Sequence, residues 1–372
     1  MGHMVITRHD EAVAVLSDPR YVPPPVRRGA APYTLGWLRE RVSRFSSGQV
    51  HAERRRTLAE RLAAIDPAAL RRAARDATVA RGGSWEGVPT AVLGAALGAS
   101  VPVPLVEAVA AGYLSGEESP DADAAVTSLL SLLTGDRLSA GHHTTDHPVT
   151  CVLGAGRLSA EDAGQDHGGG DGDVGNGDVG NGDFGDAVAV LTLLLQAHAA
   201  TEGLIRNALA HASAGNRATG HPGGDHRHQE SASGPTDRGV DGLLHETLRH
   251  DPPLQVTRRI DRVTGDEVVI DLVAANRDPG VFADPGRFDG SRGPTPHLTF
   301  GAGVRPCPGS AHAFALAAGV LDARLGAGAD TAGLDAAGID ATRIDAAGID
   351  ATGIGGSESM RPGSVRSGSR DR

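Results

Sequence analysis

Lysine is absent from this 372-residue chain, and cysteine and aromatic residues are scarce. All 35 basic side chains are therefore arginine, and the formal net charge is −11. This charge disfavours non-specific binding to nucleic acid, so we expect no nucleic-acid partner. Two cysteines, Cys151 and Cys307, are too few for a disulfide-stabilised scaffold. Because only 3% of the residues are aromatic, the core must rest on Leu, Val, Ile and Ala.

Membrane-spanning runs and a secretory signal are also not expected from the sequence. A bilayer span needs roughly 20 consecutive apolar residues, and we predict no stretch that approaches this length. The resulting expectations are a cytoplasmic protein without a membrane partner, and a monomer. The length permits one large domain with a sizeable core.

The hydrophobic pattern predicts a mainly helical chain with a few short strands. One helix is expected to begin at Asp10, which is a suitable N-cap residue. Further helices are predicted over 34–46, 49–64, 66–77, parts of 88–134, 187–210, 239–250 and 310–325. Strands are predicted over 5–7, 256–260 and 267–273. The helix over 187–210 is apolar on all sides, which is typical of a helix in the middle of a large protein.

Low-complexity segments interrupt this pattern. Residues 162–186 repeat GDVGN, and residues 211–238 are rich in His, Gly, Ser and Asp. Calcium or transition-metal binding is one interpretation of these segments, and a flexible loop is the one we favour. The tail over 328–372 has an apolar residue at every fifth position, which resembles a pentapeptide repeat but is too short to form a stable solenoid. We therefore predict one catalytic domain over 5–327 and a loosely attached tail.

The residues around Cys307 have the composition of a metal-ligand loop. Three glycines and two prolines lie between Phe300 and Gly309, directly before a predicted helix. Free N–H groups at a helix N-terminus favour thiolate over thiol. A single thiolate suits haem better than zinc, which usually takes four protein ligands in structural sites. The alternative is a buried structural cysteine in a turn.

The run F-G-A-G-V-R-P-C-P-G over 300–309 resembles the haem-binding loop of the cytochrome P450 family, F-G-x-G-x-R-x-C-x-G, at every fixed position. The resemblance covers about 5–65 and 187–325, with both terminal parts divergent. It implies the P450 fold, an α+β fold that is mainly α with small β-sheets, and haem b as cofactor. It also implies that Cys307 binds the iron within a loop closed by Gly309, that Arg305 contacts a haem propionate, and that Phe300 packs beside the sulfur.

A second matching motif is Glu246-Thr-Leu-Arg249. Residues three apart share one face of a helix and can form an ion pair. By itself such a pair is common on surfaces. In the family it is joined to a third arginine from a downstream P-x-R-F stretch, which here is Pro285-Gly-Arg287-Phe288. The resemblance therefore implies a structural ion-pair set of Glu246, Arg249 and Arg287.

The family's propionate partners also have counterparts in this chain. His51 and Arg55 match the H-x-x-x-R motif of a helix, on which residues four apart share a face. Arg259 follows the Glu246 helix, and His297 precedes the Cys307 loop. The resemblance implies that all four contact propionates, although His51 alone could equally be a surface residue.

The central helix departs from the family. The usual A-G-x-[D/E]-T motif delivers protons during oxygen activation, but here Ala199 stands in place of the acid and Ala200 in place of the threonine. Thr201 and Glu202 follow one position later, which rotates a side chain by about 100°, so we expect both to point away from the haem. For His198 we favour a packed or solvated position over one in the pocket.

The resemblance implies an oxidoreductase of the monooxygenase or oxidative-coupling type, acting on a small hydrophobic or amphipathic metabolite of bacterial secondary metabolism. Electrons would come from a ferredoxin and its reductase, and the arginine-rich segment 54–75 could dock the ferredoxin. A second hypothesis is a haem-thiolate enzyme that uses peroxide or performs a redox-neutral rearrangement or cyclisation, which the missing acid and threonine favour. A third is a haem binder without catalysis.

Overall fold

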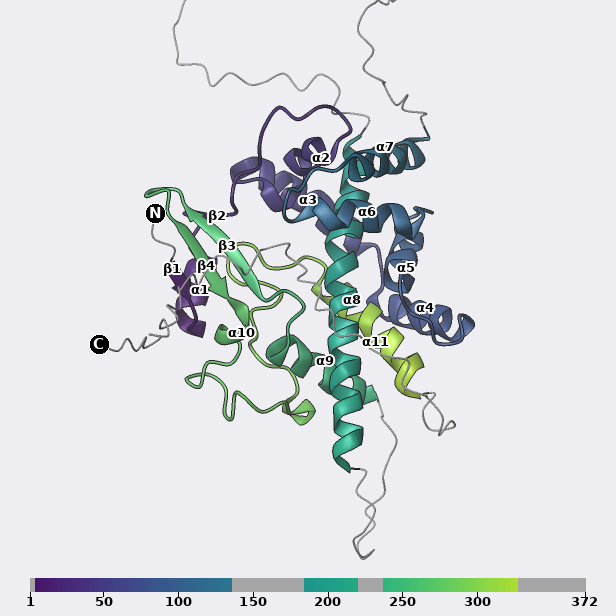
Figure 1. The fold of residues 1–372 in the computed structure, drawn as a ribbon, viewed down its shortest axis with the longest axis vertical. Coiled ribbons are helices and arrows are strands. Elements are labelled where there is room, and N and C mark those ends of the chain that lie inside the picture. The colour runs from purple at the N-terminus through teal and green to yellow at the C-terminus, as the bar shows by residue number, and fades with distance from the viewer. Residues whose placement is uncertain (1–3, 136–183, 220–236, 327–372) are drawn as a thin grey trace, which may run out of the picture.

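A computed structural model describes residues 4–135, 184–219 and 237–326 of the chain (Figure 1). Cys151, nearly all of the 162–186 segment and the 328–372 tail lie outside these residues, so the predictions for them are not tested. The helices are α1 (His9–Ser17), α2 (Leu35–Arg41), α3 (Gly48–Ala63), α4 (Pro67–Ala80), α5 (Val88–Ala96), α6 (Val103–Tyr113), α7 (Pro120–Thr134), α8 (Gly185–Thr219), α9 (Asp237–His250), α10 (Leu272–Ala275) and α11 (Ser310–Gly326). Two short 3₁₀ turns are η1 (Ser43–Phe45) and η2 (Gly290–Arg292).

The long helix α8 runs through the middle of the molecule, with α4, α5, α6 and α7 on one side and the sheet on the other (Figure 1). Leu191, Leu194 and Ile205 of α8 are completely buried, as are Leu316 and Val320 of α11. They belong to one apolar cluster that is built mainly from aliphatic side chains. The predicted reliance on aliphatic residues is confirmed.

One small mixed sheet has the strand order β1-β4-β3-β2. Strand β1 (Met4–Ile6) pairs parallel with β4 (Glu267–Asp271), which places the first described residues beside the Cys307 half of the chain. Strand β3 (Val256–Asp261) pairs antiparallel with both β4 and β2 (Tyr21–Val22). The predicted fold, mainly α with a small sheet, is confirmed.

Several predicted helix boundaries are wrong, and the helix predicted over 34–46 ends at Arg41. Asp10 is not an N-cap but lies inside α1, because the cap position is Arg8 and the carboxylate of Asp278 accepts the His9 N–H at 2.9 Å. Helix α8 does not end at residue 210 but continues to Thr219. The start of this extension is supported by a tertiary contact, because the His211 ring stacks on Phe288 with centroids 3.9 Å apart.

The expectation that no apolar stretch approaches membrane-spanning length is also wrong. Residues Gly185–Ala214 of α8 are long and apolar enough by composition. However, 67% of the most apolar window is buried inside the described structure. The apolar surface of α8 is therefore largely covered by protein, as expected for the central helix of a folded domain.

Candidate active site

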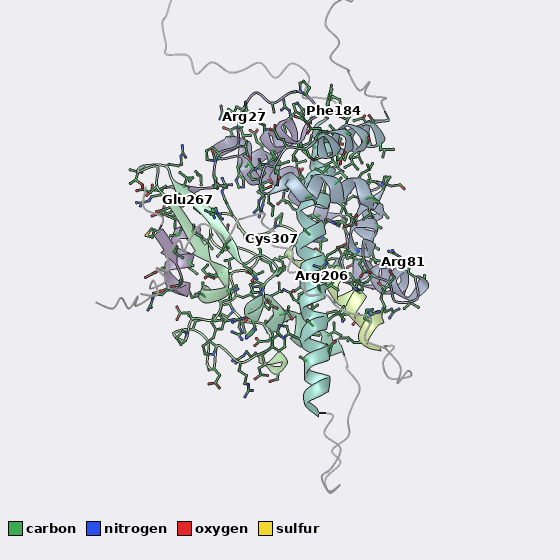
Figure 2. The ribbon with its side chains drawn as sticks, viewed as in Figure 1. Arg27, Arg81, Phe184, Arg206, Glu267 and Cys307 are labelled. Carbon is green, nitrogen blue, oxygen red and sulfur yellow. The ribbon has the colours of Figure 1, made fainter. Side chains whose placement is uncertain are left out.

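A cavity of about 720 Å³ lies beside α8 and includes Cys307 in its wall. Figure 2 shows Cys307 near the centre of the molecule, next to α8. Residues from α3, α8, α11 and β3 line the cavity. Its volume falls within the roughly 300–1,000 Å³ that is usual for small-molecule and cofactor sites.

The loop that carries Cys307 is held by its own backbone. The Cys307 N–H donates to the Phe300 carbonyl at 2.6 Å, and the Ala313 N–H donates to the Gly309 carbonyl at 2.8 Å as α11 begins. Gly301 and Gly303 have φ values of +71° and +62°, which favour glycine. The loop is thus fixed directly before a helix N-terminus, as the sequence predicted.

Gly303 also anchors the loop to the N-terminal helix. A Cβ at this position would lie 2.4 Å from the Ser17 Cα, so only glycine allows the contact. The next residue, Val304, donates its N–H to the Leu16 carbonyl at 3.2 Å. The end of α1 therefore supports the Cys307 loop from behind.

The environment of the Cys307 sulfur has two opposing effects. Burial raises the pKa of the thiol, whereas the Gly309 N–H and the nearby Arg55 and Arg44 lower it. The effect of burial is the larger one, so the pKa of the thiol is raised overall, and a bound metal ion would be needed to stabilise the thiolate.

A group of cationic side chains surrounds the same part of the cavity. Its lining includes His51 and Arg55 of α3, Arg259 of β3, Arg305 of the loop, and Arg44 of η1. The four arginines form no ion pair with any described residue, and no acidic side chain contributes to their pKa values. Burial, with Arg44 and Arg305 nearby, lowers the pKa of Arg259 to about 10.

This charge pattern fits the cofactor that the resemblance implies. Among the described lining residues the one carboxylate is Glu267, and it is already paired with Arg258 at 2.8 Å. The four arginines are partly buried, and cations held away from water are costly unless an anion joins them. The two propionates of a haem would supply that charge, beside a thiol suited to iron. Arg44 was missed from the sequence because it lies in an irregular turn, outside any motif.

Of the other predicted haem contacts, all but His297 belong to the cavity lining. Phe300 lines the cavity, as do Arg305 and Gly309. His297 does not belong to the cavity lining; its ring packs against Phe300 with centroids 5.7 Å apart. Burial lowers the pKa of His297 to about 4. Its contact with a propionate stays a prediction.

On α8 the cavity is lined by Gln196, Ala197, Ala200, Thr201 and Leu204. The expectation that Thr201 points away is therefore wrong. Residues at i, i+3, i+4 and i+7 share one helix face, so Thr201 lies on the same face as Ala197 and Leu204. The Thr201 hydroxyl is buried and has no hydrogen-bond partner among the described residues.

Glu202 and His198 do point away from the cavity, as predicted. The Glu202 carboxylate accepts the Gly87 N–H at 2.9 Å. The His198 Nδ1 lies 2.8 Å from the Thr90 hydroxyl, and its side chain is buried. Ala199 is not part of the lining either. These contacts tie α8 to α5, and among the α8 residues of the lining Thr201 is the one that carries a hydroxyl.

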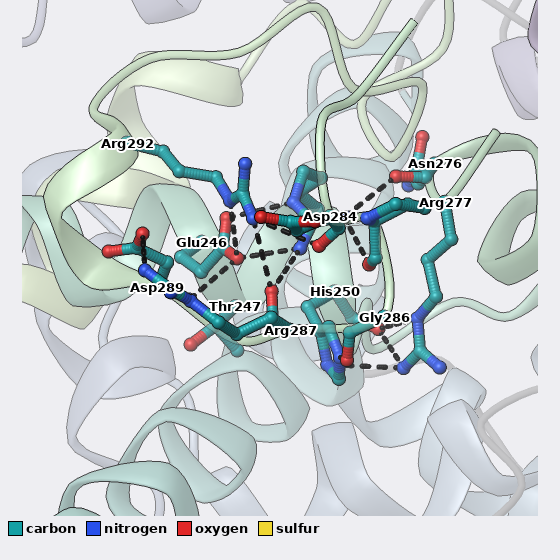
Figure 3. A network of polar contacts seen from close by, with 12 residues as sticks. Glu246, Thr247, His250, Asn276, Arg277, Asp284, Gly286, Arg287, Asp289 and Arg292 are labelled. Atoms are coloured by element: carbon teal, nitrogen blue, oxygen red, sulfur yellow. Dashed lines mark hydrogen bonds and ion pairs between the residues drawn. The ribbon is translucent and has the colours of Figure 1, made fainter. Parts of the chain in front are cut away.

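The predicted Glu246–Arg249 ion pair is present and fully buried (Figure 3). Arg249 Nη2 lies 2.6 Å from Glu246 Oε1, and Nε lies 2.8 Å from Oε2. Arg249 also donates to three backbone carbonyls, those of Asn276, Pro285 and Arg287.

The third arginine of the set is Arg292, and the prediction of Arg287 is wrong. Arg292 Nε lies 3.3 Å from Glu246 Oε1, whereas the Arg287 guanidinium binds Asp289 at 2.6 Å and is 67% exposed. The turn η2 brings Arg292 back toward α9, which the P-x-R-F motif alone could not reveal (Figure 3). Arg287 contributes only its backbone carbonyl.

No protein-family model matches the sequence. Among curated proteins, the chain is 43% identical over 77 residues to the biotin biosynthesis cytochrome P450 of Bacillus subtilis, covering 18% of this chain and 20% of that protein. It is 37% identical over 91 residues to cyclomarin C epoxidase of Salinispora arenicola, covering 22% and 23%. It is 50% identical over 46 residues to biflaviolin synthase of Streptomyces coelicolor, covering 12% and 11%. Each match spans less than a quarter of the relative's length.

The match to solved structures extends over most of the chain. A P450BioI structure, solved in complex with hexadec-9Z-enoic acid ligated acyl carrier protein, aligns with a TM-score of 0.56 at 21% identity, covering 86% of this chain and 84% of that one. A thermophilic cytochrome P450 from Sulfolobus tokodaii aligns with a TM-score of 0.56 at 18% identity, covering 87% and 86%. The chain therefore has the cytochrome P450 fold, and short segments of it are similar to P450 sequences. The P450 fold accounts for the position of α8 between the helices and the sheet.

The acid–base behaviour of His51 offers a test of the P450 cofactor site. Burial, followed by the charges of Arg305 and Arg55, lowers the pKa of His51 from 6.5 to about 4 in the haem-free protein. Since the unfolded chain binds this proton more readily, this histidine lowers the stability of the haem-free protein as the pH falls from about 6.5 to about 4. A propionate beside the ring would favour the charged form, so haem loading should raise the pKa.

The measurement is an NMR titration of the histidine rings, assigned with His51→Gln, without and with gallium protoporphyrin, a diamagnetic substitute that keeps both propionates. We expect the His51 midpoint to rise on loading and the His297 midpoint to stay low. An unchanged His51 midpoint would refute its propionate contact, and a parallel rise of His297 would support the contact predicted for that residue.

Proposed function

We propose that the chain is a haem-thiolate oxidoreductase of the monooxygenase class. The observation that carries the proposal is a single thiol in the wall of a cavity whose lining also includes four arginines without ion-pair partners among the described residues. Cys307 would bind the iron of haem b, and Arg55, Arg259, Arg305 and His51 would hold its propionates. The bound haem would supply oxygen activation and one-electron chemistry.

The residues of the chain would bind the substrate, exclude water and deliver protons. Leu93, Leu193 and Leu204 give the cavity apolar walls. Thr201 presents a buried hydroxyl that can donate and accept a hydrogen bond. It would perform the proton delivery that an acid and a threonine perform in the family motif, where this chain has Ala199 and Ala200.

The proposed substrate is a small hydrophobic or amphipathic metabolite of bacterial secondary metabolism. Two relatives named above, a biflaviolin synthase and a cyclomarin C epoxidase, support this class, although they match short segments only. The product of such an enzyme could be hydroxylated, epoxidised or coupled, since these outcomes depend on how the substrate lies in the cavity.

A ferredoxin and its reductase are the proposed electron donors. Within segment 54–75, Arg54 and Arg71 bind groups of the same chain, so they are poor docking residues. Arg56, Arg72 and Arg75 are more than half exposed, but each lies beside an exposed carboxylate of the same chain, which an acidic protein would have to displace. The monomeric state and the cytoplasmic location stay predictions.

The proposal is tested on haem-loaded protein with NADPH, a bacterial ferredoxin and ferredoxin reductase. Candidate substrates are first found by their effect on the haem absorption spectrum. We expect a substrate-dependent increase in NADPH consumption, with an oxidised product detected by mass spectrometry. If no compound that shifts the spectrum is oxidised under these conditions, the monooxygenase proposal fails.

The proton-delivery role of Thr201 predicts a clear effect of Thr201→Val. This change keeps the shape of the side chain and removes the hydroxyl. Because a positioned proton donor contributes 10²–10⁴-fold to rate, we expect product formation to fall by at least about tenfold while NADPH consumption continues. The matched control is Thr192→Val on the same helix, whose hydroxyl is bound to the Val188 carbonyl at 2.6 Å. Equal product yields from both variants would exclude the role.

The second candidate function is a peroxide-driven haem-thiolate reaction. Ala199 and Ala200 favour it, because they remove the usual acid and alcohol from the family motif. In this case hydrogen peroxide alone would support turnover of the spectrally detected compound, and ferredoxin with NADPH would not. A redox-neutral rearrangement would instead proceed with neither.

A further inference from the structure

One further cationic side chain, on helix α2, belongs to the cavity lining. Arg39 lies in the lining together with Phe45 and Leu114. Its guanidinium carbon lies 4.6 Å from the centre of the Phe45 ring, and its Nη2 donates to the Leu114 carbonyl at 3.3 Å. Its Nε is buried and has no hydrogen-bond partner among the described residues.

The positive charge of Arg39 is not neutralised by the groups around it. The carboxylate of Glu118 is the nearest acidic influence, but it is exposed and forms no ion pair with Arg39 in the described structure. Tyr113 lies close to Arg39 and Arg44, and burial raises its pKa, so it remains a neutral phenol. Burial also lowers the pKa of Arg39, which shows the cost of holding this cation away from water.

Arg39 is separate from the cations that the haem would use. Arg44 and Arg55 interact with the Cys307 sulfur, whereas Arg39 interacts with Arg44, Glu118 and Tyr113 and not with the sulfur. Arg55, Arg259 and Arg305 of the cavity lining already outnumber two propionate charges, so a bound haem would leave Arg39 without a counter-ion. Figure 2 shows the neighbouring cavity residue Arg27 well above Cys307, in the same part of the molecule as α2.

We propose that Arg39 binds the carboxylate of an amphipathic substrate whose apolar part extends toward Cys307. This inference rests on the proposed haem-thiolate function and specifies its substrate class. A planar guanidinium suits a carboxylate, with which it can form two charge-assisted hydrogen bonds. Phe45, Leu93 and Leu193 line the same cavity as Arg39 and Cys307, and their side chains suit an aliphatic or aromatic chain.

The test compares two probes of equal length, decanoate and decanamide, at pH 7.5 on haem-loaded protein. Their dissociation constants are measured by isothermal titration calorimetry, which does not depend on turnover. Because a hydrogen bond to a charged group contributes more than one to a neutral group, we expect decanoate to bind about tenfold more tightly than decanamide. Arg39→Gln should reduce this ratio to about one, and Arg39→Lys should retain part of it.

The matched control is Arg41→Gln on the same helix. Arg41 lies over the Trp37 ring and is not part of the cavity lining, so its removal changes the net charge equally without touching the site. Equal binding of the two probes by the unmodified protein would overturn the proposal without any variant. So would a preference for decanoate that survives Arg39→Gln, or one that Arg41→Gln also removes. A failure of the haem-thiolate function is recognised independently, from the spectrum of the reduced carbon monoxide complex.

Discussion

Cys307→Ala is expected to abolish the red-shifted absorption band of the reduced carbon monoxide complex, which marks thiolate ligation of haem iron. The cavity lining contains no second sulfur among the described residues, so no other side chain there can supply a thiolate. The arginines that would hold the propionates remain, so some haem should still bind. Activity should fall to the background of free haem, because axial thiolate ligation determines the chemistry of this class.

The control for this experiment is Val304→Ala, which alters an exposed side chain on the same loop. We expect it to keep the band and the activity. The measurement is the difference spectrum of the reduced protein with and without carbon monoxide, with haem content determined separately. A Cys307→Ala protein that retained the red-shifted band would show that another residue binds the iron, and the proposed function would be wrong.

Glu246→Gln is expected to lower the free energy of unfolding by about 3–5 kcal/mol, because it leaves the charge of Arg249 buried and unpaired. Glu246 and Arg249 are both completely buried. Arg249 also donates to three backbone carbonyls, which are neutral and do not replace the lost carboxylate charge. The measurement is urea unfolding followed by circular dichroism, on haem-loaded protein.

Two further variants distinguish the observed ion-pair set from the one that the sequence predicts. Arg292→Met removes the partner that lies 3.3 Å from Glu246 and should destabilise the protein measurably. Arg287→Met removes an exposed side chain and should change the free energy of unfolding by less than about 0.5 kcal/mol. The reverse order of the two effects would mean that the predicted Arg287 is the true partner.

The parts of the site that could be predicted are those encoded by adjacent residues. The Cys307 loop is a short run whose glycines and prolines determine its own backbone, and Glu246 and Arg249 share a helix face at a spacing of three. Both are local relationships, so periodicity and motif matching are sufficient to find them. The order of the helices and three of the four strands followed from the same kind of information.

The parts that could not be predicted depend on how separate segments meet. Arg292 replaces Arg287 because of the direction in which η2 turns, and this direction is not encoded in the motif itself. Thr201 was expected to point away because its position was compared with a family motif. In the structure it shares a face of α8 with Ala197, and both residues line the cavity. Arg39 and Arg44 lie in a short helix and a single turn, where no periodicity marks a residue as facing a cavity.

The contact between Gly303 and Ser17 makes the amino-terminal residues part of the support for the proposed haem site. Strand β1 and helix α1 are far from Cys307 in sequence, yet the loop rests on the last turn of α1. A bulkier residue at position 303, or loss of the first twenty residues, would remove the support against which the sulfur is positioned. Iron retention in this protein should therefore respond to changes nearly three hundred residues upstream of the ligand.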